Sequence, residues 1–89
     1  MSTKEILNNL SGYTEIKNEN LSAIALQVKT LTEDYQNNVL SAGEYTELLR
    51  DVEISQVIVE GAAELNAQKE LNMIINTAIT IAATAAKAI

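Results

Sequence analysis

The feature that most restricts the fold of this chain is a helix stop followed at once by a helix start near the middle of the sequence. Asn37 and Asn38 tolerate the left-handed conformation that ends a helix. Ser41 and Glu44 have the spacing of a capping box, in which each side chain accepts a hydrogen bond from the backbone N–H of the other residue. Apolar residues at helical spacing run up to this point and resume after it. The chain is therefore expected to fold back here as an antiparallel helical hairpin.

Composition supports an all-α fold. The 89 residues include no proline and only three glycines, while alanine and other good helix formers are plentiful. The aromatic residues are three tyrosines, with no phenylalanine or tryptophan, so the core must be built from aliphatic side chains on closely packed helices. The length predicts one helical domain, 1–89.

The first segment, 1–12, is predicted to form a short helix that acts as a docking arm. Ser2 and Glu5 form a second capping-box pattern, and Ile6 and Leu10 lie on one helical face. A helix of about 12 residues or fewer is marginal in water, so the arm must dock on the hairpin or on a neighbouring molecule.

The first hairpin helix is predicted over 14–38. Its apolar residues follow heptad spacing for just over two heptads, which favours a bundle helix with coiled-coil-like packing. The predicted packing residues of this helix are Leu21, Ile24, Val28, Leu31 and Tyr35. Their predicted partners after the turn are Tyr45, Leu48, Leu49 and Val52.

The second hairpin helix is predicted to be long, running over 42–88 with a bend allowed at Gly61. No cluster of helix-breaking residues interrupts the helical spacing on either side of that glycine. About 45 residues at the ideal helical rise span on the order of 68 Å, so the predicted shape is a rod.

The end of the chain changes character at Leu71. From there to Ile89 the only charged residue is Lys87, and one hairpin offers too little surface to cover so apolar a helix. We expect neighbouring molecules to cover it, as large apolar surfaces normally mark interaction sites. The predicted intermolecular interface comprises Ile74, Ile75, Ala78, Ile79, Ile81, Ala82, Ala85, Ala86 and Ile89.

A transmembrane span is the alternative interpretation of these 19 residues. The asparagines, threonines and weakly hydrophobic alanines argue against it, as does the lack of an aromatic belt. A membrane therefore ranks below a homo-oligomer or other protein subunits as the expected partner. No signal peptide is expected, because no apolar run follows Lys4, and no compartment is predicted.

The residue types also exclude several kinds of chemistry. The chain has no histidine and no cysteine, so the commonest general base and the commonest metal ligands are missing. The spacing of its carboxylates matches no known metal motif, and its serines have no histidine to activate them. Twelve acidic against six basic residues give a net charge of −6, which argues against nucleic acid as a partner. We predict no enzyme activity, no metal and no cofactor.

The run from Tyr35 to Asp51 resembles the helical hairpins of small structural proteins of tailed bacteriophages. It reads as an aromatic residue, a short polar turn, an aliphatic residue and serine, then glutamate, an aromatic residue and a Leu-Leu pair. The resemblance covers 17 of the 89 residues. It implies an oligomerisation or docking element without catalytic residues.

These observations predict a non-enzymatic structural or assembly subunit that acts by helix packing, with a phage virion as the implied setting. Two alternatives stay open. One is a small membrane-active protein, such as a lysis or ejection factor, that inserts its carboxyl-terminal helix. The other is an acidic chaperone or inhibitor whose charged face binds a basic partner.

Overall fold

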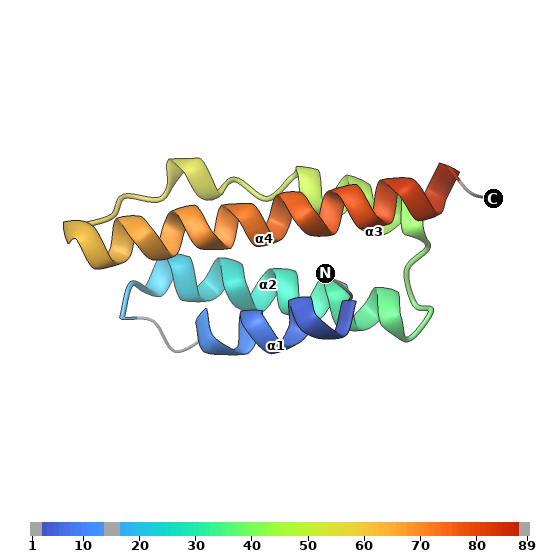
Figure 1. Cartoon of the computed structure of the whole chain (residues 1–89), viewed down its shortest axis with the longest axis horizontal. Coiled ribbons are helices and arrows are strands. Elements are labelled where there is room, and N and C mark those ends of the chain that lie inside the picture. The colour runs from blue at the N-terminus through green and yellow to red at the C-terminus, as the bar shows by residue number, and fades with distance from the viewer. Residues whose placement is uncertain (1–2, 14–16, 88–89) are drawn as a thin grey trace.

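The computed structural model describes residues 3–13 and 17–87. Within these ranges the chain forms four α-helices, a short 3-10 turn and no strand, so the predicted all-α class is confirmed. The bundle measures 43 × 19 × 19 Å. In chain order the elements are α1 (Thr3–Tyr13), α2 (Glu19–Gln36), α3 (Ala42–Arg50), the 3-10 turn η1 (Ile54–Gln56) and α4 (Gly61–Lys87) (Figure 1).

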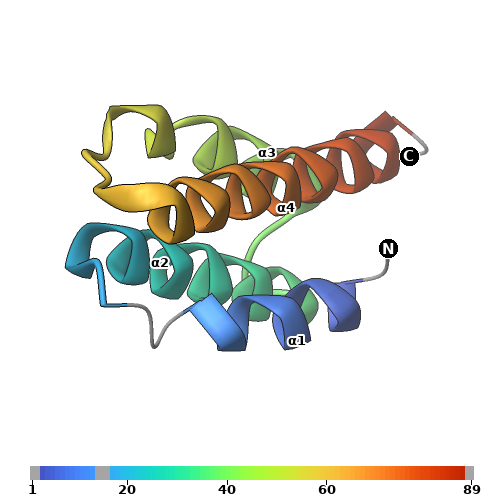
Figure 2. The same ribbon diagram turned by 60° about the vertical axis from the view of Figure 1, so that its left-hand side comes forward.

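The helices form two antiparallel pairs that lie against each other. The docking arm, α1, packs mainly on α2, and α3 packs mainly on α4. The two pairs face each other, and the segment 37–41 joins them at one end of the bundle (Figures 1 and 2). The weaker seams of the bundle are those between α2 and α3, between α1 and α4, and between α2 and α4.

The turn between the two pairs has the predicted geometry. Asn38 adopts a left-handed conformation with φ 63°. Ser41 caps α3: its Oγ accepts a hydrogen bond from the Glu44 N–H at 3.1 Å, and the Glu44 carboxylate accepts one from the Ser41 N–H at 3.0 Å. The helix stop and start are therefore encoded where the sequence indicated.

The start of α2 differs from the prediction of a helix over 14–38. Residues 14–16 lie outside the described residues, and α2 begins at Glu19. Asn18 is its N-cap, and the Asn18 side-chain oxygen accepts hydrogen bonds from the N–H groups of Asn20 and Leu21, each at 3.1 Å.

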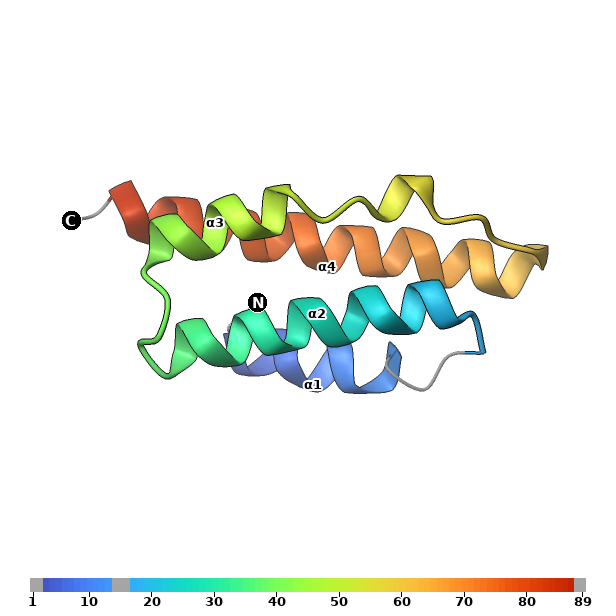
Figure 3. The same cartoon turned by 180° about the vertical axis from the view of Figure 1, so that it is seen from behind.

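The prediction of one long helix over 42–88 is wrong, because residues 51–60 form an irregular strap between α3 and α4 (Figure 3). β-Branched residues, which are weaker helix formers than leucine or alanine, dominate the strap. Ile54 is buried in the core, and Val57 and Val59 are half-buried against it. The strap therefore lies along α4, and the molecule is 43 Å long rather than a rod of about 68 Å.

Side chains from other elements hold the strap in place. The Gln68 amide donates hydrogen bonds to the backbone carbonyls of Ile54 at 2.9 Å and Val57 at 3.1 Å. The Asn18 amide donates to the carbonyl of Ile58 at 3.1 Å and to the Glu64 carboxylate at 3.2 Å. These bonds satisfy strap carbonyls that a continuous helix would have used itself.

Gly61 reverses the chain rather than bending a helix. Its φ is +83°, a conformation that glycine adopts without the steric cost paid by other residues. The Glu64 carboxylate accepts a hydrogen bond from the N–H of Glu60 at 2.7 Å, which anchors the first turn of α4. The direction of the chain after Gly61 sends α4 back along the whole bundle.

The core lies between the two helical pairs. Of the residues predicted to pack in the hairpin, Leu21, Val28, Tyr45 and Leu49 are buried. Four others, Ile24, Leu31, Tyr35 and Val52, are partly buried around them. The Tyr35 and Tyr45 rings stack with centroids 4.6 Å apart. Leu48 is 39 % exposed and lies away from the core, contrary to the prediction.

Candidate interaction groove

The predicted intermolecular surface is largely occupied by the chain itself. Ile74 belongs to the core, but 7 % of its surface stays exposed. Ile75, Ala78 and Ala82 are also buried in the core of a single copy and are not available to a neighbouring molecule. The reason is the reversal at Gly61. It folds α4 against the other helices, which supply the cover that a lone hairpin could not.

The rest of the predicted interface remains partly accessible. Ile79, Ile81, Ala85 and Ala86 are half-buried on the last turns of α4, and Ile79 and Ile81 pack against the core. Ile89 lies outside the described residues.

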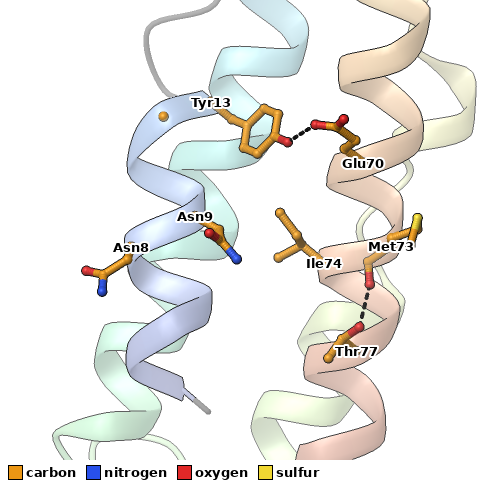
Figure 4. A pocket seen from close by; sticks show the side chains of 8 residues that line it. Asn8, Asn9, Tyr13, Glu70, Met73, Ile74 and Thr77 are labelled. Atoms are coloured by element: carbon orange, nitrogen blue, oxygen red, sulfur yellow. Dashed lines mark hydrogen bonds between the residues drawn. The ribbon is translucent and has the colours of Figure 1, made fainter. Parts of the chain in front are cut away.

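A groove of about 560 Å³ lies between α1 and α4. It follows one of the weaker seams of the bundle (Figure 4). Three polar or aromatic side chains and one glycine from α1 form one wall, and four residues of α4 form the other. The lining residues are Asn8, Asn9, Gly12, Tyr13, Glu70, Met73, Ile74 and Thr77.

The groove has an apolar surface on the α4 side. Ile74 is 7 % exposed and belongs to the core, whereas Met73 beside it is 68 % exposed. The hydroxyl of Thr77 donates to the carbonyl of Met73 at 2.8 Å, within the same helix. A flexible thioether side chain next to a buried aliphatic residue can adapt to apolar partners of different shapes.

A hydrogen bond between Tyr13 and Glu70 connects the two walls at one end of the groove. The Tyr13 hydroxyl donates to the Glu70 carboxylate (Figure 4). Burial, and then the hydrogen bond to Glu70 and its negative charge, raise the pKa of Tyr13 to about 12. Tyr13 is therefore protonated near neutral pH and keeps its role as donor.

Gly12 leaves the α1 wall open. A Cβ atom built at this position meets no heavy atom within 4 Å. A side chain introduced at residue 12 would therefore occupy free space next to the groove without displacing core atoms. Position 12 is therefore a place where a side chain can be added at the edge of the groove.

The sequence reasoning missed most of the groove. Of the lining residues, Ile74 alone was among the predicted interface residues. The others include two asparagines, the glycine at the last position of the predicted first segment, and an exposed methionine, and none of these is distinctive in a sequence. Their only common signal is position: they occupy the flank of α1 beside Ile6 and Leu10 and the flank of α4 beside the buried stripe.

Across residues 3–13 and 17–87, no three His, Cys, Asp or Glu side chains come together in a group that could hold a metal ion. In the same part of the chain, no helix has the combination of length and apolar character needed to cross a membrane.

Comparison of the chain with protein-family models, with curated proteins and with solved structures finds no match.

Proposed function

We propose that this protein is a non-enzymatic structural or assembly subunit that binds another protein by helix packing in the groove between α1 and α4. The observation that supports this proposal is Met73, which is 68 % exposed beside the buried Ile74 in a groove of about 560 Å³. Exposed apolar side chains that line a concave surface are typical of interaction sites.

The surroundings of the groove also favour a binding role over catalysis. The lining residues offer one carboxylate, two amides and two hydroxyl groups. Both hydroxyl groups already donate hydrogen bonds, one to Glu70 and one to the Met73 carbonyl. This set lacks a nucleophile with an adjacent general base, the arrangement that covalent catalysis requires.

The proposed setting in a phage virion depends on the resemblance of residues 35–51 to phage helical hairpins. The groove does not add to that part of the proposal. The groove supports only the proposed mode of action, in which helices of this chain contact helices of another subunit.

Co-expression of the tagged chain with the products of its neighbouring genes tests the proposal. We expect one of them to co-purify with it as a complex of defined stoichiometry, larger than the 9.7 kDa chain in sedimentation velocity. A chain that sediments as a monomer alone and with every neighbouring product would contradict an assembly role.

A further inference from the structure

The charge around the groove between α1 and α4 defines the kind of partner that fits it. Glu70 is the only charged side chain among the lining residues. The whole chain carries a net charge of −6. A partner with basic residues is therefore attracted both by the protein as a whole and by the carboxylate inside the groove.

The Tyr13 hydrogen bond orients that carboxylate. Tyr13 donates to one oxygen, Oε2, of Glu70. A carboxylate has two oxygens and about four acceptor positions, so it can accept further donors while it keeps this bond. A lysine or arginine at this end of the groove would form a charge-assisted hydrogen bond.

The dimensions of the groove suit a helix. The α4 wall extends from Glu70 to Thr77, a rise of about 10 Å over seven residue steps. That length corresponds to about two turns of a helix lying alongside. An aliphatic side chain of such a helix would reach Met73 and Ile74, and a basic side chain one turn away would reach Glu70.

Charge also decides against a second copy of this chain as the occupant. Two copies would each carry a net charge of −6 over the whole chain. Like charges oppose association unless the interface brings opposite charges together. The exposed face of α1 next to the groove offers Asn8 and Asn9, which cannot neutralise Glu70.

We infer that the groove between α1 and α4 binds a basic amphipathic helix of a partner protein, with an aliphatic residue against Met73 and Ile74 and a lysine or arginine on Glu70. The inference rests on the proposed assembly function and specifies its partner. The attraction should weaken as the salt concentration rises, because the Debye length is about 10 Å at 0.1 M salt.

Two synthetic helical peptides of about 18 residues serve as probes, because shorter helices are marginal in water. One has leucines at helical spacing and lysines elsewhere, and the other has glutamates in place of the lysines. Fluorescence anisotropy of the labelled peptide measures binding. The lysine peptide should bind the wild-type chain and the glutamate peptide should not.

Matched variants separate binding in the groove from general attraction to an acidic protein. Gly12→Gln places a side chain beside the groove, and Gly43→Gln makes the same change on α3, where a Cβ meets only the Ser41 Oγ at 4.0 Å. We expect Gly12→Gln to weaken binding about tenfold or more and Gly43→Gln to change it by less than about twofold. Circular dichroism should show both variants folded, since glutamine is a better helix former than glycine.

A second pair of variants tests the carboxylate. Glu70→Gln and Glu47→Gln remove the same charge, the first inside the groove and the second on the exposed face of α3. The expected loss of affinity is about fivefold for Glu70→Gln and much smaller for Glu47→Gln. Glutamine can still accept the Tyr13 hydrogen bond, so the wall stays connected.

Several results would overturn the inference. Equal losses from Glu70→Gln and Glu47→Gln would show non-specific attraction, as would unchanged binding by Gly12→Gln. Equal binding of the two peptides, or no binding of either, would exclude a basic helix. Self-association that Gly12→Gln abolishes would make a second copy the occupant. The assembly function would survive a failure of this inference if a complex still co-purifies and Gly12→Gln leaves it intact.

Discussion

The pair Thr32 and Tyr45 gives the sharpest test of how the two helical pairs are held together. Both residues are buried, with Thr32 at 0 % and Tyr45 at 1 % exposure. The Thr32 hydroxyl donates to the carbonyl of Val28 at 2.7 Å, and its oxygen lies 2.6 Å from the Tyr45 hydroxyl. Because a hydroxyl has one hydrogen to donate, Tyr45 must be the donor in the second bond.

The expected free energies of unfolding follow from this assignment. Tyr45→Phe removes one neutral hydrogen bond and leaves Thr32 bonded to Val28, so it should cost about 1 kcal/mol. Thr32→Val leaves the Tyr45 hydroxyl buried without an acceptor, which should cost about 2 kcal/mol. In the double variant no unsatisfied hydroxyl remains, so the total cost should be about 1 kcal/mol less than the sum of the single costs.

Urea denaturation followed by circular dichroism measures all four free energies, with the slope of the transition checked for two-state behaviour. Tyr35→Phe is the control, because it keeps the aromatic ring that stacks on Tyr45. Costs that add within about 0.3 kcal/mol would refute the hydrogen bond between Thr32 and Tyr45. A large cost for Tyr45→Phe with little for Thr32→Val would reverse the donor assignment.

Three further predictions concern the reversal of the chain and two titrating groups. Gly61→Ala should lower the free energy of unfolding by about 1 kcal/mol in urea denaturation, because the φ of Gly61 is +83°. Gly12→Ala, within helix α1, should raise the free energy of unfolding by up to about 1 kcal/mol. Equal effects of the two substitutions would contradict this account. The backbone N–H of Glu60 and then the Asn18 amide lower the pKa of Glu64, so this residue stabilises the fold above the usual carboxyl pKa and the stabilisation is lost as pH falls through the lowered value. Thermal unfolding at a series of pH values should show that loss, and Glu64→Gln should reduce it. Tyr13 has a pKa of about 12 against the ordinary 10.0, so it stabilises the fold fully below pH 10 and loses this effect as pH rises towards 12. Ultraviolet titration should show that Tyr13 ionises late and that Glu70→Gln makes it ionise at lower pH. An unchanged titration curve in Glu70→Gln would contradict the contact with Glu70.

Local signals in the sequence predicted the parts of the fold that depend on neighbouring residues. The capping box of Ser41 and Glu44 and the left-handed Asn38 involve residues within one turn of each other. Their hydrogen bonds form in the chain segment that encodes them, so the pattern and the structure agree. The all-α class followed in the same way from composition.

The strap could not be predicted because long-range contacts decide its conformation. Residues 51–60 keep apolar residues near helical spacing, but their backbone carbonyls bond to Gln68 and Asn18, which are distant in sequence. A β-branched run at this position was the available signal for a break. Without that break, Gly61 is interpreted as a bend in one long helix, and the apolar end of α4 is then predicted to need another molecule to cover it.

The same error explains the misassigned interface. The side chains of Ile75 and Ala78 are too apolar for solvent, and that part of the reasoning was physically sound. What the sequence could not indicate was the identity of the covering surface, which is chiefly α3, together with α1, α2 and the strap. The groove residues depend on the same helix arrangement and were equally inaccessible to pattern reasoning.

The position of Asn18 has a consequence for how the molecule opens. The segment 37–41 connects the two helical pairs covalently at one end, and Asn18 connects α2 to Ile58 and Glu64 at the other (Figures 1 and 3). The two pairs are therefore joined by a peptide turn at one end, and the hydrogen bonds of Asn18 join them at the other in addition to the one between Tyr13 and Glu70. Thermal fluctuations that break these hydrogen bonds separate the two helical pairs at the end far from the segment 37–41. Amide hydrogens beside Asn18 should therefore exchange sooner than those beside Ser41.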